Sequence, residues 1–159
     1  MILVTVGSTR FPFARMNALV ARLSEKNKKR EQIVFQYGAL APQYYHPPIT
    51  LFPYINQNEL LRYMKKARLV ISHGGPGTIY QALSFGKIPW VFPRKARFGE
   101  HLTDHQVDFC LFMAKRHLVH IISDNTPIPV ITKGSPKTKP LRRHNHELVS
   151  YLHSLCRSL

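Results

Sequence analysis

Acidic side chains are scarce in this chain. Only 8 Asp and Glu stand against 23 Lys and Arg, which gives a formal net charge of +15 at pH 7, and residues 60–99 contain no acid at all. A field of one sign attracts phosphates, nucleic acid or an anionic membrane surface. The charge therefore predicts an anionic partner, and charge alone leaves these three kinds open.

Long apolar runs are also lacking, since none approaches the roughly 18 residues of a membrane-spanning helix. Residues 1–6 have the pattern of a buried strand, without the basic leader and cleavage site of a signal peptide. We therefore expect a cytoplasmic protein. Its 44% hydrophobic and 19% charged residues favour one globular domain. The two cysteines, Cys110 and Cys156, lie at apolar positions of helical patterns, which predicts buried free thiols rather than a disulfide or metal site.

The apolar pattern alternates between strand and helix. Strands are predicted at 1–6, 33–35, 49–52, 69–71, 89–92 and 118–122, with helical spacing between them. One helix is predicted to begin at the cap Asn56, with Glu59 three residues later, and another to stop at Gly86. This alternation indicates an α/β fold with a doubly wound, Rossmann-like parallel sheet. We expect that domain over 1–123, a basic loop containing Pro and Lys over 124–143, and an amphipathic C-terminal helix over 144–159.

The turn after the first strand is a candidate site, because ligands of open α/β sheets bind at the carboxyl ends of the strands. It contains Gly7, Ser8 and Thr9. The glycine permits a tight turn, and hydroxyls and amides beside a helix N-terminus suit a phosphate. A turn of this composition also occurs for geometry alone, so both interpretations stay open.

The turn after the fourth strand reads Ser72-His73-Gly74-Gly75-Pro76-Gly77-Thr78. Three glycines let the backbone approach a ligand closely, and Gly77 and Thr78 open a helix whose N–H groups can point at a diphosphate. The spacing is neither that of a P-loop nor the dinucleotide-binding Gly-x-Gly-x-x-Gly. By itself His73 could be a helix cap or a packed residue, and the glycines favour a ligand site.

The segment 94–106, after the fifth strand, is dense in polar side chains. Carboxylates and amides of this kind hold hydroxyl-rich ligands such as sugars. Two alternatives exist: Thr103 and Gln106 have the spacing of a capping box, and two histidines with two carboxylates could bind a metal. Nothing else in the chain demands a metal, and we predict none. The polar residues are Glu100, His101, Asp104, His105 and Gln106.

Together these three segments resemble glycosyltransferase family 28 of the C-terminal-domain type, from residue 1 to about 122. The resemblance lies chiefly in Val70-Ile71-Ser72-His73-Gly74-Gly75-Pro76-Gly77-Thr78 and in Phe98-Gly99-Glu100-His101-x-x-Asp104-His105-Gln106. The chain is similar to the small soluble subunits of bacterial exopolysaccharide glycosyltransferases. It also resembles the catalytic subunit that adds the second N-acetylglucosamine to dolichyl-diphosphate, and the donor domain of the peptidoglycan lipid II N-acetylglucosaminyltransferase. The resemblance implies a single C-terminal-type half of a GT-B glycosyltransferase.

The resemblance further implies a hexosyltransferase with a UDP-sugar donor and no required cofactor. By position, residues 7–9 lie near the phosphates, residues 74–78 meet the diphosphate and ribose, and residues 104–106 face the donor hexose. Many relatives have a Glu three residues after Thr78 that binds the ribose hydroxyls, where this chain has Gln81, whose bonds lack the strength that charge adds. The expected UDP-sugar-binding residues are Gly7, Ser8, Thr9, His73, Gly74, Gly75, Gly77, Thr78, Gln81, Glu100, His101, Asp104, His105 and Gln106.

The resemblance also implies a second polypeptide. A GT-B enzyme has two such domains across a cleft, so a membrane-anchored partner subunit should supply the half that binds a lipid-diphosphate-linked sugar acceptor for exopolysaccharide or capsule synthesis. The chain would then be peripheral at the inner face of the plasma membrane, and its positive charge fits an anionic membrane surface. The reaction would be inverting, with the base on the partner or, in this chain, at His73, His101 or His105.

Two other functions remain as alternatives. A non-catalytic subunit that activates the partner enzyme is favoured by Gln81 and by the single domain. A nucleic-acid-binding module is suggested by charge alone; because no recognised motif is present, we expect no nucleic-acid partner.

Overall fold

The computed structural model describes residues 1–27, 31–42, 45–128 and 131. Strands and helices alternate as the apolar pattern predicted, with strand ends shifted by a residue or two. A short 3-10 helix, η1, was not predicted. In chain order the elements are β1 (Ile2–Thr5), α1 (Ala14–Glu25), β2 (Ile33–Gln36), β3 (Ile49–Phe52), α2 (Gln57–Lys66), β4 (Leu69–Ser72), α3 (Pro76–Ser84), β5 (Trp90–Val91), η1 (Ala96–Phe98), α4 (His105–Lys115) and β6 (His120–Ile121).

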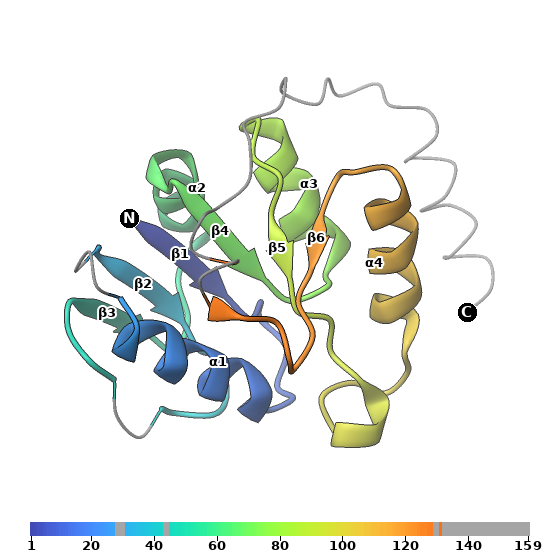
Figure 1. Ribbon diagram of the computed structural model, residues 1–159, viewed down its shortest axis with the longest axis horizontal. Coiled ribbons are helices and arrows are strands. Elements are labelled where there is room, and N and C mark those ends of the chain that lie inside the picture. Colours follow the sequence, from blue (N-terminus) through green and yellow to red (C-terminus); the bar gives the residue numbers. More distant parts are fainter. Residues whose placement is uncertain (28–30, 43–44, 129–130, 132–159) are drawn as a thin grey trace.

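The described strands form one six-stranded sheet in the order β3-β2-β1-β4-β5-β6 (Figure 1). All neighbouring pairs are parallel, and central β1 pairs with both β2 and β4. The chain steps outward from β1 to β3, then crosses back to β4 and steps outward the other way. The order therefore reverses between β1 and β4, and a reversal of this kind opens a crevice at the carboxyl ends of the strands. The predicted doubly wound, Rossmann-like sheet is confirmed.

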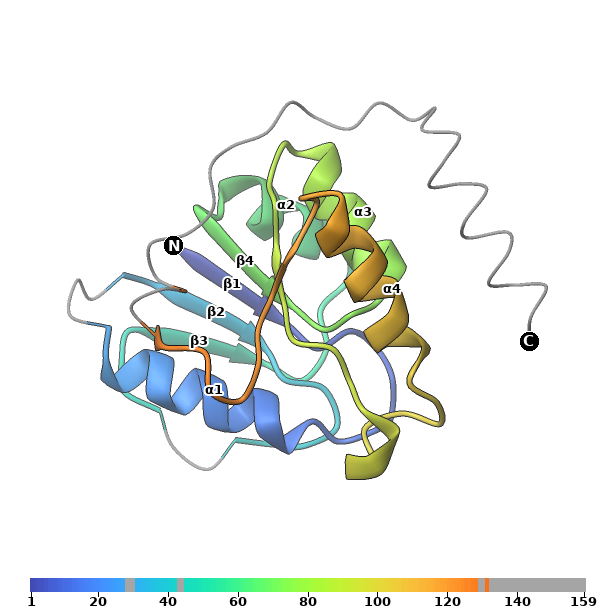
Figure 2. The same cartoon turned by 45° about the vertical axis from the view of Figure 1, so that its right-hand side comes forward.

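Helices cover both faces of the sheet (Figures 1 and 2). On one face Leu19 of α1 packs in the same apolar cluster as Val4 of β1. On the other face, which α2, α3 and α4 cover, Leu3 of β1 packs with Met64 and Ala82. Successive residues of a strand point to opposite faces, so a strand covered on both sides is apolar throughout. This is why β1 reads as a continuous apolar run.

Local signals placed several element ends correctly. The Asn56 side chain accepts from the Glu59 amide at 2.9 Å and caps α2. Gly86 ends the turn after α3 with a φ of 66°, a left-handed conformation that favours glycine. Cys110 is a buried free thiol, and burial raises its pKa to about 12. Cys156 lies outside the described residues.

The core continues beyond β6. Ile128 and Ile131 are buried in the cluster that α1 covers, so apolar contacts extend past residue 123. The helix predicted at 144–159 and most of the basic loop lie outside the described residues. Of the helices in the described ranges, none has the length and apolar character to cross a membrane.

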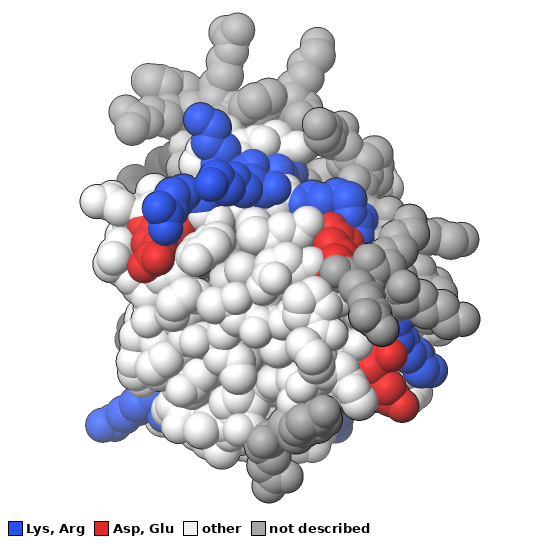
Figure 3. Space-filling view, turned by 90° about the vertical axis from the view of Figure 1, so that its left-hand side faces the viewer, with Lys and Arg blue, Asp and Glu red and all other residues white. Residues whose placement is uncertain are grey.

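One group of basic side chains lies in the last turns of helices, away from the carboxyl ends of the strands. The last turns of α1, α2 and α4 carry Arg22, Lys65, Lys66 and Lys115. Figure 3 shows Lys and Arg collected along the upper end of the molecule, where α2 finishes, above a broad uncharged area. Cations are favoured there by the helix dipole, so part of the positive charge has a structural explanation.

Candidate functional site

A small crevice of about 200 Å³ opens where the chain leaves the carboxyl ends of the central strands. It lies at the reversal of strand order between β1 and β4, where ligands of this fold class bind. Its walls come from the ends of β1 and β2, the turn between β3 and α2, and the start of α3. The lining residues are Thr5, Gly7, Ser8, Gln36, Tyr54, Ile55, Gln57, Leu60, Gly77, Thr78 and Gln81.

Gln36 fixes the floor of this crevice. Its side chain, 3% exposed, accepts from the Thr5 hydroxyl at 2.7 Å and donates to the carbonyls of Gly7 and Pro53 at 2.9 Å each. A buried amide whose donor and acceptor are satisfied rigidifies its surroundings. One side chain thus holds the ends of β1, β2 and β3 relative to one another.

His73 fills the space between two glycine turns. A Cβ at Gly7 would lie 2.6 Å from its imidazole, and one at Gly75 would lie 2.2 Å away, so both positions require glycine while the ring keeps its place. The ring is 8% exposed, and its Nδ1 has no hydrogen-bond partner in the described part of the chain. Burial above all, and then the charge of Arg94, lowers the pKa of His73 to about 4, so the ring is neutral at pH 7. His73 is a packed residue that spaces the two turns.

The first turn of α3 presents free backbone donors to the crevice. No side chain caps this helix, and within the described residues the N–H groups of Gly77 and Thr78 donate to no acceptor. A Cβ added at Gly77 would meet nothing within 4 Å, so the backbone there faces open space. Uncapped N–H groups and the helix dipole together favour an anion. Gly74 has a packing reason instead, because a Cβ would lie 2.8 Å from the Cys110 sulfur.

The two carboxylates between residues 94 and 106, which were expected to bind a ligand, instead make hydrogen bonds that hold their own loop in place. Glu100 is buried, and it accepts from the Arg15 Nε at 2.9 Å and from the Lys95 amide at 3.0 Å. Asp104 is exposed, and its Oδ1 accepts from the Ala96 amide at 2.7 Å. Neither lines the crevice. Their bonds explain why this segment is dense in acids without requiring a ligand.

Gln106 does not cap α4, so the capping-box alternative is wrong. The helix begins at His105 without a side-chain cap, and the Gln106 Oε1 accepts from the Arg94 amide at 3.4 Å. His101 and His105 meet edge to face with ring centroids 4.8 Å apart, and His101 lies 5.8 Å from Phe11 of the first turn. Burial, and then His105, lowers the pKa of His101. These two histidines therefore lie beside the turn after β1.

The structure brings together only part of the site that the sequence predicted. The predicted residues in the crevice are Gly7, Ser8, Gly77, Thr78 and Gln81. The predicted residues outside its lining are Thr9, His73, Gly74, Gly75, Glu100, His101, Asp104, His105 and Gln106.

Sequence reasoning missed the wall formed by the turn after β3. The rule that ligands bind at strand ends applies to that turn as well, and would have found Tyr54 and Ile55. Gln36 could have been found as the polar residue that ends the apolar run of β2. Gln57 and Leu60 were placed on a helix, but no sequence signal showed that they face the crevice.

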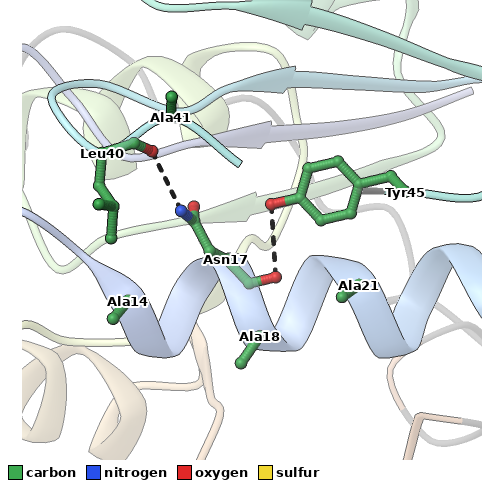
Figure 4. A pocket seen from close by; sticks show the side chains of 7 residues that line it. All are labelled: Ala14, Asn17, Ala18, Ala21, Leu40, Ala41 and Tyr45. Carbon is green, nitrogen blue, oxygen red and sulfur yellow. Dashed lines mark hydrogen bonds between the residues drawn. The ribbon is translucent and has the colours of Figure 1, made fainter. Parts of the chain in front are cut away.

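A second hollow, of about 360 Å³, runs along α1 (Figure 4). Asn17 donates to the Leu40 carbonyl at 3.0 Å, and the Tyr45 hydroxyl donates to the Asn17 carbonyl at 3.4 Å. Most of its wall is alanine methyl, which offers nothing to bind a charged ligand. The residues that line this hollow are Ala14, Asn17, Ala18, Ala21, Leu40, Ala41 and Tyr45.

In the described part of the chain, no group of three or more His, Cys, Asp or Glu is placed to hold a metal ion.

Comparisons with known proteins support the fold described above. Residues 1–126 match the family model for the glycosyltransferase family 28 C-terminal domain. The fold is similar to that of the glycotransferase of kitacinnamycin, with a TM-score of 0.61 and 18% identity over 83% of this chain and 32% of that one. It is also similar to MurG of Acinetobacter baumannii, with a TM-score of 0.58 and 17% identity over 83% of this chain and 39% of that one. No curated protein matches the chain.

At such identities the solved structures show the fold alone, and this chain spans well under half the length of either. The family match extends from β1 past β6 and includes every turn that forms the crevice. The fold is Rossmann-like, of the kind found in the C-terminal half of GT-B glycosyltransferases. The chain belongs to the family of the glycosyltransferase family 28 C-terminal domain.

Proposed function

We propose that this chain binds the UDP-sugar donor of a glycosyltransferase, with the donor diphosphate on the first turn of α3. The observation that carries the proposal is the pair of unpartnered N–H groups at Gly77 and Thr78, which open into a crevice closed on the other side by Gly7 and Ser8. Helix N-termini bind diphosphates through such groups. Membership of a glycosyltransferase family supports sugar transfer as the reaction.

The size of the crevice indicates how the donor would lie. At about 200 Å³ it is smaller than the roughly 300–1,000 Å³ typical of pockets that enclose a whole small molecule. We therefore place the nucleoside inside, beside Tyr54 and Ile55, where the Gln81 amide can bond ribose hydroxyls. The hexose would extend outward, past the turn after β1, toward His101 and His105.

The proposed chemistry is an inverting displacement. The acceptor hydroxyl attacks the anomeric carbon, the bond from that carbon to the diphosphate oxygen breaks, and UDP leaves with the electron pair. The α3 amides stabilise the charge that develops on the leaving group. A base must take the acceptor proton. Since His73 is enclosed, Glu100 is bonded to Arg15 and Asp104 is bonded to the Ala96 amide, His101 and His105 remain this chain's candidates.

The acceptor side would come from outside this chain, which spans 32% and 39% of the length of its structural neighbours. We propose a membrane-anchored partner subunit that binds a lipid-diphosphate-linked sugar, as part of exopolysaccharide synthesis. The net charge of +15 supports work at an anionic surface. An activating subunit without catalysis is the second candidate, because Gln81 replaces a charged ribose ligand.

The test has two steps. Titration of the full chain with uridine, UMP and UDP should show affinity rising at each step, since each phosphate adds charge for the α3 amides. The purified pair, supplied with a UDP-sugar and a lipid-linked acceptor, should then transfer the hexose. A crystal grown with UDP that shows the nucleotide outside the crevice would end the proposal. UDP binding without transfer by the pair would favour the activating subunit.

A further inference from the structure

Arg94 is fully buried, with 0% of its surface exposed, although it carries a charge. It lies just after β5, between the turn that follows β1 and the loop that leads to α4. Its Nη2 donates to the Val6 carbonyl at 2.9 Å. Its Nη1 donates to the carbonyls of Phe11 at 3.0 Å, Glu100 at 3.1 Å and Pro12 at 3.3 Å. One guanidinium thus joins three segments that meet at the rim of the site.

The turn after β1 depends on this side chain for its position. Within the described residues, no backbone-to-backbone hydrogen bond involves residues 8–12. The bond from the Phe11 amide to the Thr9 hydroxyl, at 3.3 Å, is internal to the turn. Gln36 holds the near end of the turn through the Gly7 carbonyl, while Arg94 bonds both Val6 at the near end and Phe11 at the far end. Without Arg94 the far end of the turn would lose its hydrogen bonds to the segment after β5 and would be held only by the packing of Phe13 at the start of α1.

Stability does not explain a buried guanidinium here. Its acceptors are all neutral carbonyls, because the Glu100 carboxylate is bonded to Arg15 instead. Its Nε has no partner in the part of the chain that the structure describes. An apolar side chain of similar volume often gives a more stable protein than a buried charge. A planar fork with five donors can, however, bind carbonyls from several segments at once.

The guanidinium also places positive charge behind the turn. Burial lowers the pKa of Arg94 to about 10, opposed by the charge of Glu100, so the group stays protonated at pH 7. The face of Phe13 lies 4.6 Å from it. Its charge lowers the pKa of His73, which lies against Gly7. The field of Arg94 therefore reaches the turns that would meet the diphosphate.

We infer that Arg94 is a positioning residue, which holds Gly7 and Ser8 in place for the anionic part of the ligand by tying the far end of their turn to the loop before α4. The inference rests on the proposed function for the identity of the ligand. The positioning itself is a statement about the free protein and can be measured without any ligand.

The test compares Arg94→Lys and Arg94→Met with the wild-type full chain. Arg94→Lys keeps the charge and loses the planar fork. The NMR order parameters of the backbone amides of residues 8–11 should therefore fall from the rigid range, about 0.85, to about 0.6 or below, while those of residues 77 and 78 stay unchanged. Affinity for UDP should fall about tenfold in Arg94→Lys and further in Arg94→Met, in which the charge is also lost. Arg62→Lys, an exposed residue paired with Glu59 on α2, is the matched control and should change neither measurement.

The outcomes separate the inference from the proposed function. If wild-type protein binds no UDP, the proposed function fails, while a loss of order confined to residues 8–11 in Arg94→Lys still supports positioning. Unchanged order parameters there in Arg94→Lys overturn the inference, and so do order parameters that fall evenly across the sheet, because Arg94 would then be a core residue alone. Wild-type UDP affinity in a folded Arg94→Lys protein also overturns it. If Arg94→Met does not fold, Arg94→Lys carries the test.

Discussion

Replacing Gly77 by Asp should remove nucleotide binding while leaving the fold intact. Gly77 lies in the first turn of α3, and a Cβ there meets nothing within 4 Å, so the new side chain enters open space. A carboxylate in a first turn favours the helix by about 0.3–1 kcal/mol, and leaving glycine adds a few tenths. The variant should therefore be as stable as the wild type or slightly more so.

The same carboxylate would lie beside the amides that we expect to bind the diphosphate. Two unit charges about 5 Å apart repel by about 3 kcal/mol at an effective dielectric constant of about 20. Screening at physiological salt reduces this to about 2 kcal/mol, which corresponds to about a twentyfold to thirtyfold loss of UDP affinity. Helix stability and ligand affinity should thus change in opposite directions.

Calorimetric titration with UDP at 0.15 M and 1 M salt, beside urea denaturation, measures both quantities. The gap between Gly77→Asp and wild type should narrow at high salt, because screening lengths shorten. Ala14→Asp puts the same charge in the first turn of α1, away from the crevice lining, and should bind normally. Equal UDP affinity in Gly77→Asp and wild type at low salt would refute the reasoning.

Three further predictions concern stability, each measured by urea denaturation. Gly75→Ala should destabilise the protein by about 1–3 kcal/mol, because its Cβ would lie 2.2 Å from the His73 ring; a neutral result would show that the ring moves freely. Gln36→Leu should lower the unfolding free energy by about 1–3 kcal/mol, since the Thr5 hydroxyl and two carbonyls lose their partner; unchanged stability would contradict the role of Gln36. The pKa of His73 is lowered to about 4 from its ordinary 6.5, so the unfolded chain binds the proton first as pH falls. Stability should therefore be full above pH 6.5 and decline by up to about 3 kcal/mol toward pH 4, a loss that His73→Gln should reduce; an equal decline in both proteins would contradict it.

The fold was largely readable because its signals are local. Asn56 capped α2 and Gly86 ended the turn after α3, as their residue types predicted. Capping and left-handed turns depend on a few neighbouring residues, so the sequence contains the whole cause. The hydrogen-bond partner of Gln106 could not be predicted in this way. Its side chain accepts from the Arg94 amide across a loop whose path the sequence does not show.

The site was readable only in part. The glycine turns were found, but the reasons for their glycines differ: Gly77 faces open space, whereas Gly74 and Gly75 are packed against Cys110 and His73. The acids of 94–106 suggested sugar binding, and Glu100 proved to be bonded to Arg15. Composition reports which groups are available, and it does not report which are already paired.

The sequence by itself determined the alternation of strands and helices, the caps, and the turns where a ligand could meet backbone amides, because each follows from periodicity or from the properties of single residues. Only the tertiary structure decided that the turn after β3 forms a wall of the crevice, and that Gln36 and Arg94 hold the turn after β1 at its two ends. Those contacts join residues far apart in the chain, and their geometry exists only once the sheet has brought the strand ends together.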